Sequence, residues 1–309
     1  MAKFFKVCLV IGLICIGVGV AASAAGVSLG GLSQLKDQVL QGEWTFNWEH
    51  ITGEQAPFFE LDKQEYFDHN AEVYENSARQ ESSFAVDEIQ AIHVKTSGIT
   101  VKFMTHNGND ILVYAAKTGK FQNYIKEQEL VITATGQNTK ELGEGLVEIL
   151  IPETLCNAAV LDVDVEASAC VIDLGMLALD EVDLEVSAGT VSWKQLEAEA
   201  LSLEMAAGAV KGSSTSILQQ TDIKMHAGSV EISGSLGTET ELEIMAGKIS
   251  MKLTNAYTDF NYDISCAGGS VILGEEEVQG LGKEFKKNHN ASNDMDIECS
   301  AGAVEITFE

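Results

Sequence analysis

The stretch "LEVSAGTVSW", residues 184–193, joins two short apolar segments through an Ala-Gly pair. The same pattern returns in "LEMAAGAVKG" (203–212), "IKMHAGSVEI" (223–232), "LEIMAGKISM" (242–251), "ISCAGGSVIL" (264–273) and "IECSAGAVEI" (297–306). Before it, "VEASACVIDL" (165–174) has the same form with a cysteine at the glycine position. Repetition of one unit is typical of a repeat protein, in which each unit buries its apolar side against the next.

The spacing of the units indicates the size of one structural repeat. Aligned on the glycine of the pair, they are centred on Cys170, Gly189, Gly208, Gly228, Gly247, Gly269 and Gly302. The steps are 19, 19, 20, 19, 22 and 33 residues, and the last step contains an inserted loop at 274–292. This period predicts an all-β fold, a right-handed parallel β-helix or β-solenoid with coils of about 19 residues.

Two columns of the aligned repeat are always apolar and are expected to point into the core. Five residues before the glycine stand Val165, Leu184, Leu203, Ile223, Leu242, Ile264 and Ile297. Two residues after it stand Ile172, Val191, Val210, Val230, Ile249, Val271 and Val304. The glycine column has two interpretations: a corner at positive φ, which glycine adopts without strain, or a position that admits only small residues, as Cys170 suggests.

The residues before the repeats divide into three segments. Residues 83–150 alternate apolar and polar side chains in runs such as "ITVKF", which predicts short strands that open the solenoid domain, 83–309. Residues 33–82 are acidic and aromatic without a steady period, and we interpret them as a linker or stalk. Residues 1–32 contain an uncharged segment at 7–29 that follows Lys3 and Lys6.

The uncharged segment is long enough to cross a membrane as a helix, with the basic N-terminus in the cytoplasm and the repeats outside it. We therefore expect a single-pass membrane anchor. The alternative is a cleavable signal peptide, because "AASAA" at 21–25 resembles a small-residue cleavage site.

The formal net charge of -28 narrows the class of partner. A surface with this charge repels nucleic acid, so partners held by electrostatics should be cationic or bridged by a metal. The cysteines show no CxxC pair that would indicate a metal site. They are interpreted as small core residues, although Cys266 and Cys299 share one repeat position, which leaves a disulfide between neighbouring coils open.

Acidic residues recur at outward positions of the repeat. Six residues before the glycine, the column reads Asp164, Asp183, Ser202, Asp222, Glu241, Asp263 and Asp296. In stacked coils these carboxylates would lie about 5 Å apart and repel one another. Either they form a solvated face that keeps the sheet soluble, or they form a weak cation-binding face, for which calcium is the candidate because it prefers clustered oxygen ligands.

An enzymatic role is not expected. A catalytic carboxylate pair should interrupt the repeat pattern at one place and have a basic residue nearby, whereas these acidic residues recur from unit to unit. His226, the histidine within a repeat, is interpreted as a surface substitution. The sequence predicts no catalytic or cofactor-binding residue.

The units resemble the bacterial "putative adhesin" β-strand-repeat family, also called domain of unknown function 4097. The likeness rests on the N-terminal apolar segment, on the strand "VEILIPETL" (147–155) before the repeats, and on the repeated strand-(S/T/A)-(A/S)-G-x-strand unit, over about residues 84–309. The family is described mostly from surface and envelope proteins, and it supplies no catalytic residue. This chain departs from it by its acidity and by alanine before the glycine, where many relatives have serine or threonine.

The sequence therefore predicts a membrane-anchored, extracytoplasmic β-solenoid that binds, adheres or acts as a scaffold at a bacterial cell envelope. Its partner would be a component of the envelope or another protein, and not nucleic acid. Two alternatives stay open: a secreted adhesin, and a carbohydrate-active β-helix enzyme.

Overall fold

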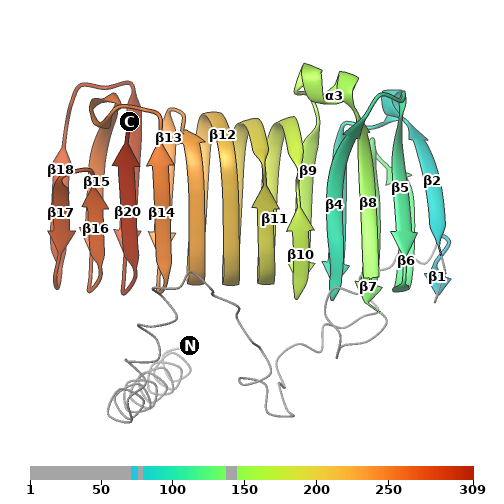
Figure 1. Cartoon of the computed structure of the whole chain (residues 1–309), viewed down its shortest axis with the longest axis horizontal. Coiled ribbons are helices and arrows are strands. Elements are labelled where there is room, and N and C mark those ends of the chain that lie inside the picture. The colour runs from blue at the N-terminus through green and yellow to red at the C-terminus, as the bar shows by residue number, and fades with distance from the viewer. Residues whose placement is uncertain (1–70, 76–78, 137–144) are drawn as a thin grey trace, which may run out of the picture. The chain divides into compact units, whose positions relative to one another are not determined.

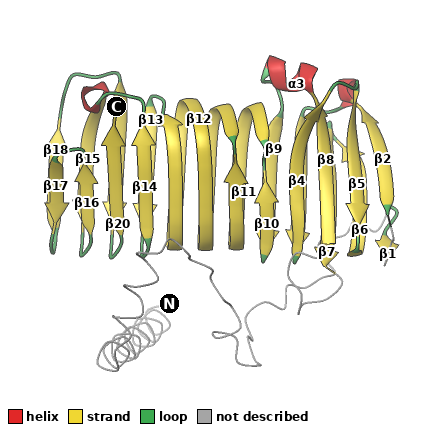
Figure 2. Ribbon diagram, viewed as in Figure 1, coloured by secondary structure: helices red, strands yellow, loops and turns green. Residues whose placement is uncertain are grey.

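The computed structural model describes residues 71–75, 79–136 and 145–309. Contacts divide the chain into two units, Met1–Leu61 and Asp62–Glu309, and the described residues all belong to the second. Strands make up nearly all of this part, with short helical turns where strands end (Figures 1 and 2). The predicted membrane helix lies outside the described residues; within them, no helix has the length and apolarity to span a bilayer.

The central coils follow one another as the period predicts. Their strands are β9 (Asp162–Ser168), β10 (Cys170–Asp173), β11 (Met176–Trp193), β12 (Gln195–Ser235), β13 (Glu239–Ile244) and β14 (Lys248–Leu253). Neighbouring coils pair in parallel and in register, so that Gly189 lies opposite Gly208 and Leu184 opposite Leu203. We call the strand segments before the glycine column the A row and those after it the B row.

The core of the solenoid is formed by the two apolar columns named from the sequence. All members of both columns are at most 2 % exposed. A third buried column, Leu177, Leu196, Ile217 and Leu236, fills the coil after the second corner. Successive side chains of a strand face opposite sides, so the residues between these positions point outward. The prediction of an all-β, solenoid-like fold is confirmed, while its right-handed winding stays a prediction.

Four members of the glycine column, Gly189, Gly208, Gly228 and Gly247, require glycine for two physical reasons. Gly208 has φ 144°, and a Cβ added to it would collide with the carbonyl oxygen of Gly189 in the preceding coil. Cys170 fits at the start of the column because the positive φ moves back by one residue, to Ala169 at 56°. Ala169 lies beside Gly98, which has φ 72°, so that end of the solenoid has a different corner.

Two further coils precede the repeats. They consist of β3 (Ala91–Ser97) with β4 (Ile99–His106), and of β7 (Glu129–Gly136) with β8 (Gly145–Pro152). β3 pairs in parallel with both β7 and β9, and β4 with both β8 and β10. The first coil in the sequence therefore lies between the second coil and the first repeat, which an alignment of the repeats does not predict.

The same inversion occurs at the other end of the solenoid. The last unit, β19 (Asn293–Cys299) and β20 (Ala303–Phe308), lies between β13–β14 and the preceding unit, β15 (Phe260–Cys266) and β16 (Ser270–Leu273). Figure 1 shows β20 between β14 and β16. In space, Gly302 therefore follows Gly247 and precedes Gly269, because the chain turns back after the sixth unit and inserts its C-terminal strands.

Antiparallel strands cover both ends of the parallel stack. At one end these strands are β1 (Tyr74–Glu75), β2 (Gln80–Ala85), β5 (Asp110–Ala116) and β6 (Thr118–Lys126). At the other end, β17 (Glu276–Gln279) pairs with β16 and β18 (Lys283–Lys287) pairs with β15. The lysines of β18 oppose further strand addition at this edge. A short helix, α3 (Glu153–Ala158), connects β8 to the first repeat.

Candidate functional site

Six carboxylates form one outward column on the A row, which we call the acidic ladder. In spatial order the column reads Asp164, Asp183, Ser202, Asp222, Glu241, Asp296 and Asp263. The sequence predicted that all six acids share one column, and the register agrees. It did not predict that Asp296 separates Glu241 from Asp263, because the order follows from the inserted C-terminal coil.

A second acidic column runs beside the ladder, two residues further along each strand. It contains Glu166, Glu185, Glu204, Lys224, Glu243, Glu298 and Ser265. Together the two columns form what we call the acidic face. The outward side of the B row has a mixed charge, since Lys211 and Lys248 alternate there with Glu231 and neutral residues. Of these two rows, the A row thus carries the greater negative charge.

Basic side chains end the ladder on both sides. Asp164 lies opposite His93, and Asp263 lies opposite Lys286. The Lys286 Nζ is 2.5 Å from Asp263 Oδ2. Within the face, Lys224 Nζ is 2.7 Å from Oδ2 of Asp222. Attraction at these positions offsets part of the repulsion between stacked carboxylates, whereas Glu241 and Asp296 lie opposite other acids.

The His93 end brings an imidazole among carboxylates. His93 Nδ1 is 3.0 Å from Glu129 Oε1 and 3.1 Å from Asp164 Oδ2. Its Nε2 is 3.2 Å from Glu166 Oε1, close enough for an ion pair although the geometry does not make a hydrogen bond. Lys95 Nζ contacts the same Glu166 oxygen at 2.8 Å. Two basic side chains therefore share three acids in a half-buried network.

This network is the one place in the described part of the chain where three potential metal ligands converge. Donor atoms of His93, Asp164 and Glu166 lie within 4.8 Å of one another. An imidazole with carboxylates suits a first-row transition metal such as zinc better than calcium, which prefers oxygen ligands alone. Sequence reasoning missed His93. The signal was present in "IHVKT" (92–96), where His93 and Lys95 occupy outward positions of an alternating strand.

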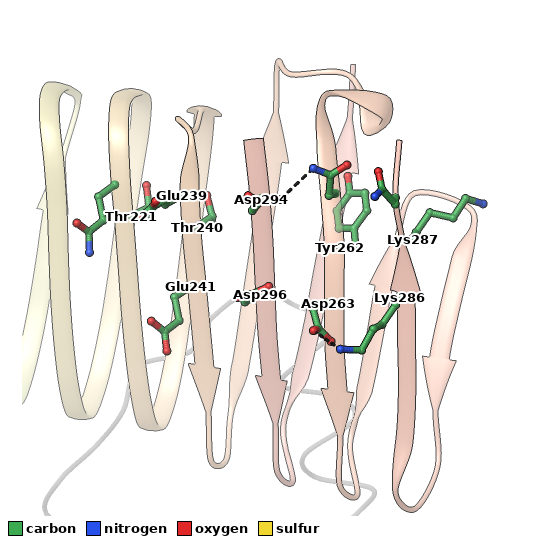
Figure 3. Close-up of a pocket in the computed structure, with 13 residues that line it drawn as sticks. Thr221, Glu239, Thr240, Glu241, Tyr262, Asp263, Lys286, Lys287, Asp294 and Asp296 are labelled. Carbon is green, nitrogen blue, oxygen red and sulfur yellow. Dashed lines mark hydrogen bonds and ion pairs between the residues drawn. The ribbon is translucent and has the colours of Figure 1, made fainter. Parts of the chain in front are cut away.

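A groove opens along the other end of the ladder, where the inserted coil meets the end strands. Its volume is about 570 Å³, and its lining includes Glu239, Glu241, Asp294, Asp296, Asn261 and Lys286. Figure 3 shows Glu241, Asp296 and Asp263 following one another across neighbouring strands, with Lys286 reaching Asp263 from β18. Asn261 Nδ2 donates a hydrogen bond to Asp294 Oδ1 at 2.9 Å.

Two carboxyls of the ladder, those of Asp296 and Asp164, are held in surroundings that disfavour their charge. Burial raises the pKa of Asp296 above its ordinary value, and the neighbouring carboxylates of Asp263 and Asp294 raise it further. Burial also raises the pKa of Asp164, with Asp183 acting in the same direction while His93 opposes it. A cation placed beside such a group is stabilised more than one beside an isolated surface carboxylate.

The spacing of the groove carboxylates limits the kind of cation that they can hold. Stacked acids on neighbouring strands are separated by about 4.8 Å along the stack. Among the residues that the structure describes, no set of three groove carboxylates meets as the His93 set does. The arrangement therefore favours an extended ligand with several positive groups over a single metal ion, while calcium binding by the ladder stays a prediction.

The fold and the acidic face define the class: an all-β solenoid of parallel coils with a densely charged outer side. The Toastrack DUF4097 family model matches residues 87–307, so the chain belongs to this family. The resemblance seen in the sequence is confirmed. No curated protein matches the chain.

Crystal structures that are similar to this chain include the following three. A "putative cell adhesion protein" from Clostridium sporogenes has 10 % identity and a TM-score of 0.34, covering 75 % of this chain and 99 % of its own. A "putative adhesin" from Bacteroides fragilis has 12 % identity and a TM-score of 0.35, covering 76 % of this chain and 100 % of its own. Another from Parabacteroides merdae has 10 % identity and a TM-score of 0.30, covering 75 % and 98 %.

Proposed function

We propose that this protein is a non-catalytic binding or scaffolding module of the bacterial cell envelope, and that its acidic face holds a cationic partner. The observation that carries this proposal is the in-register acidic ladder, in which acids recur on neighbouring coils despite their mutual repulsion. A positively charged partner relieves that repulsion. The mixed charge of the B row supports a binding surface limited to one side.

The groove at Glu241 and Asp296 is the part of the face best suited to begin this contact. Both acids lie opposite acidic neighbours, and the groove offers amide groups beside them. A chain with ammonium or guanidinium groups, such as a basic peptide segment or a polyamine, can bridge acids about 5 Å apart and fill a groove of this volume.

The proposed location depends on the segment at 7–29, which lies outside the described residues. We infer a single-pass anchor with the solenoid on the extracytoplasmic side, and a secreted adhesin is the alternative if the segment is cleaved. External protease on intact cells should remove the solenoid in the anchored case. A mature N-terminus near Ala24 would instead indicate secretion, and full protection from protease would contradict export.

The binding experiment uses calorimetry of the full chain with spermine at low and at high salt. The expected result is binding that weakens by about tenfold or more between 50 and 500 mM sodium chloride, because screening reduces the attraction. Calcium chloride at the same ionic strength serves as the metal comparison. Equal responses to spermine, calcium and sodium would contradict a cationic partner and leave only a solvated face.

Two double variants with the same change of charge locate the contact. E241Q/D296N removes two acids from the groove, whereas E185Q/E204Q removes two neighbouring acids elsewhere on the acidic face. The first variant should lose most of the spermine affinity and the second only a small part. Equal losses would show that the face acts as a whole and that the groove has no special part.

The alternative function, a carbohydrate-active β-helix enzyme, makes a different prediction for single variants. Hydrolysis should disappear when one aspartate of the ladder is replaced, whereas binding should decline in steps as several are replaced. The recurrence of the acids along the stack favours binding, because a catalytic pair needs one distinct position.

A further inference from the structure

Two cysteines face each other where the C-terminal coil is inserted. Cys266 ends β15 and Cys299 ends β19, and the two residues are register partners in this parallel pair. Their exposure is 0 % and 1 %, and both thiols are free in the structure. The two strands are joined by a backbone hydrogen bond next to the cysteines: Ala267 N donates to the Cys299 carbonyl oxygen at 2.8 Å.

This placement is close to what a disulfide needs. Register partners on neighbouring strands have Cα atoms about 4.8 Å apart, within the range of about 4.4 to 6.8 Å that disulfides span. Both side chains occupy the same inward column and point to the same side of the sheet. The Cys266 thiol is near enough to interact with Cys299, whose Sγ lies 3.3 Å from the Gly302 carbonyl oxygen.

The pair also stands at a topologically special place. β19 and β20 are the last strands of the chain, and they lie between coils that precede them in the sequence. Their side chains, such as Met295 and Ile297, are buried, but only non-covalent contacts hold them in the stack. We propose that Cys266 and Cys299 form a disulfide under oxidising conditions, and that this bond locks the inserted coil to its neighbour.

The reaction is a thiol–disulfide exchange with a small external disulfide, for example oxidised glutathione. One cysteine thiolate attacks the glutathione disulfide and releases one glutathione thiol, which leaves a mixed disulfide. The second thiolate attacks that bond, forms the Cys266–Cys299 disulfide and releases the second glutathione. Two protein thiols are oxidised and one disulfide is reduced to two thiols, so that electrons and protons balance.

Burial makes this exchange depend on opening of the inserted coil. Burial raises the pKa of the Cys299 thiol, and the Cys266 thiol adds to this effect, so little thiolate is present in the closed coil. Oxidation should therefore be slow in native buffer and faster where the last coil opens, for example in low urea. Disulfide formation then reports the opening of β19 and β20.

Cys156 and Cys170 supply internal controls, because both are buried but neither has a cysteine as a register partner. The full chain is incubated with oxidised glutathione, unfolded, alkylated and mapped by mass spectrometry. Among the four cysteines that the structure describes, the expected product is one cross-linked peptide pair, Cys266 with Cys299, while Cys156 and Cys170 stay alkylated. The Tm of the oxidised sample should be about 5–15 °C higher than that of the reduced sample, because the disulfide closes a long loop of the chain.

Matched variants make the result decisive. C299A should abolish both the cross-link and the rise in Tm between reduced and oxidised samples, whereas C156A should preserve both. Because each variant is compared with its own reduced form, a general loss of stability does not obscure the difference. Absence of the cross-link in low urea, a different pairing, or a lower Tm after oxidation would overturn the proposal.

Discussion

The replacement Asp296→Asn tests whether stacked carboxylates destabilise the fold. Asp296 has acids as register partners on both sides, Glu241 on β13 and Asp263 on β15. Asparagine keeps the shape of the side chain and removes its charge. We therefore expect a gain in stability, whereas most substitutions reduce it.

The magnitude follows from the spacing of the strands. Two unit charges about 4.8 Å apart repel by about 0.9 kcal/mol at the dielectric constant of water. Two such neighbours would give about 1.8 kcal/mol. Solvent exposure lowers this sum, and Lys286, which pairs with Asp263, offsets part of it. The expected gain is therefore about 0.5–1 kcal/mol at low salt, or about 1–4 °C in Tm.

The assay is urea unfolding followed by circular dichroism at 10 and 500 mM sodium chloride, because urea does not screen charge. The gain should shrink at high salt. Glu231→Gln is the matched control: Glu231 is an exposed acid on the B row with Ser250 as a register partner. A loss of stability in Asp296→Asn, or an equal gain in the control, would refute the reasoning.

Three further results are expected. The raised pKa values of Asp164 and Asp296 mean that the folded state binds protons more tightly than the unfolded state. The contribution of these two carboxyls to folding stability is therefore largest below about pH 4 and is lost as the pH rises through their folded pKa values. Tm should increase when the pH is lowered from 7 to 4.5. Leu203→Asp, at a site 1 % exposed, should destabilise the fold by about 3–5 kcal/mol, while Glu204→Ala next to it should change stability by less than about 0.5 kcal/mol. Similar effects at both sites would contradict the assignment of inward and outward positions. Gly208→Ala should lower Tm by several degrees, about as much as a substitution that leaves a cavity in the core, because its φ of 144° and the adjacent carbonyl exclude a Cβ. An unchanged Tm would contradict that corner geometry.

The period, the inward columns and the glycine corners could be predicted because they depend on the order of residues within one repeat. Side chains of a strand alternate in direction, so Leu203 and Glu204 must face opposite sides wherever the strand lies. A repeat of constant length then aligns equal residues on neighbouring coils. The acidic ladder followed from the same two facts, apart from the order of its members.

Only the tertiary structure decided which coils are neighbours at the two ends. All coils present nearly the same apolar columns, so Leu242 can stack against Ile264 or Ile297 equally well, and the sequence does not distinguish these arrangements. The turns and antiparallel end strands decide between them through contacts far apart in the chain. They place Asp296 between Glu241 and Asp263, and His93 against Asp164, because both arrangements depend on the order of coils and not on the pattern within one coil.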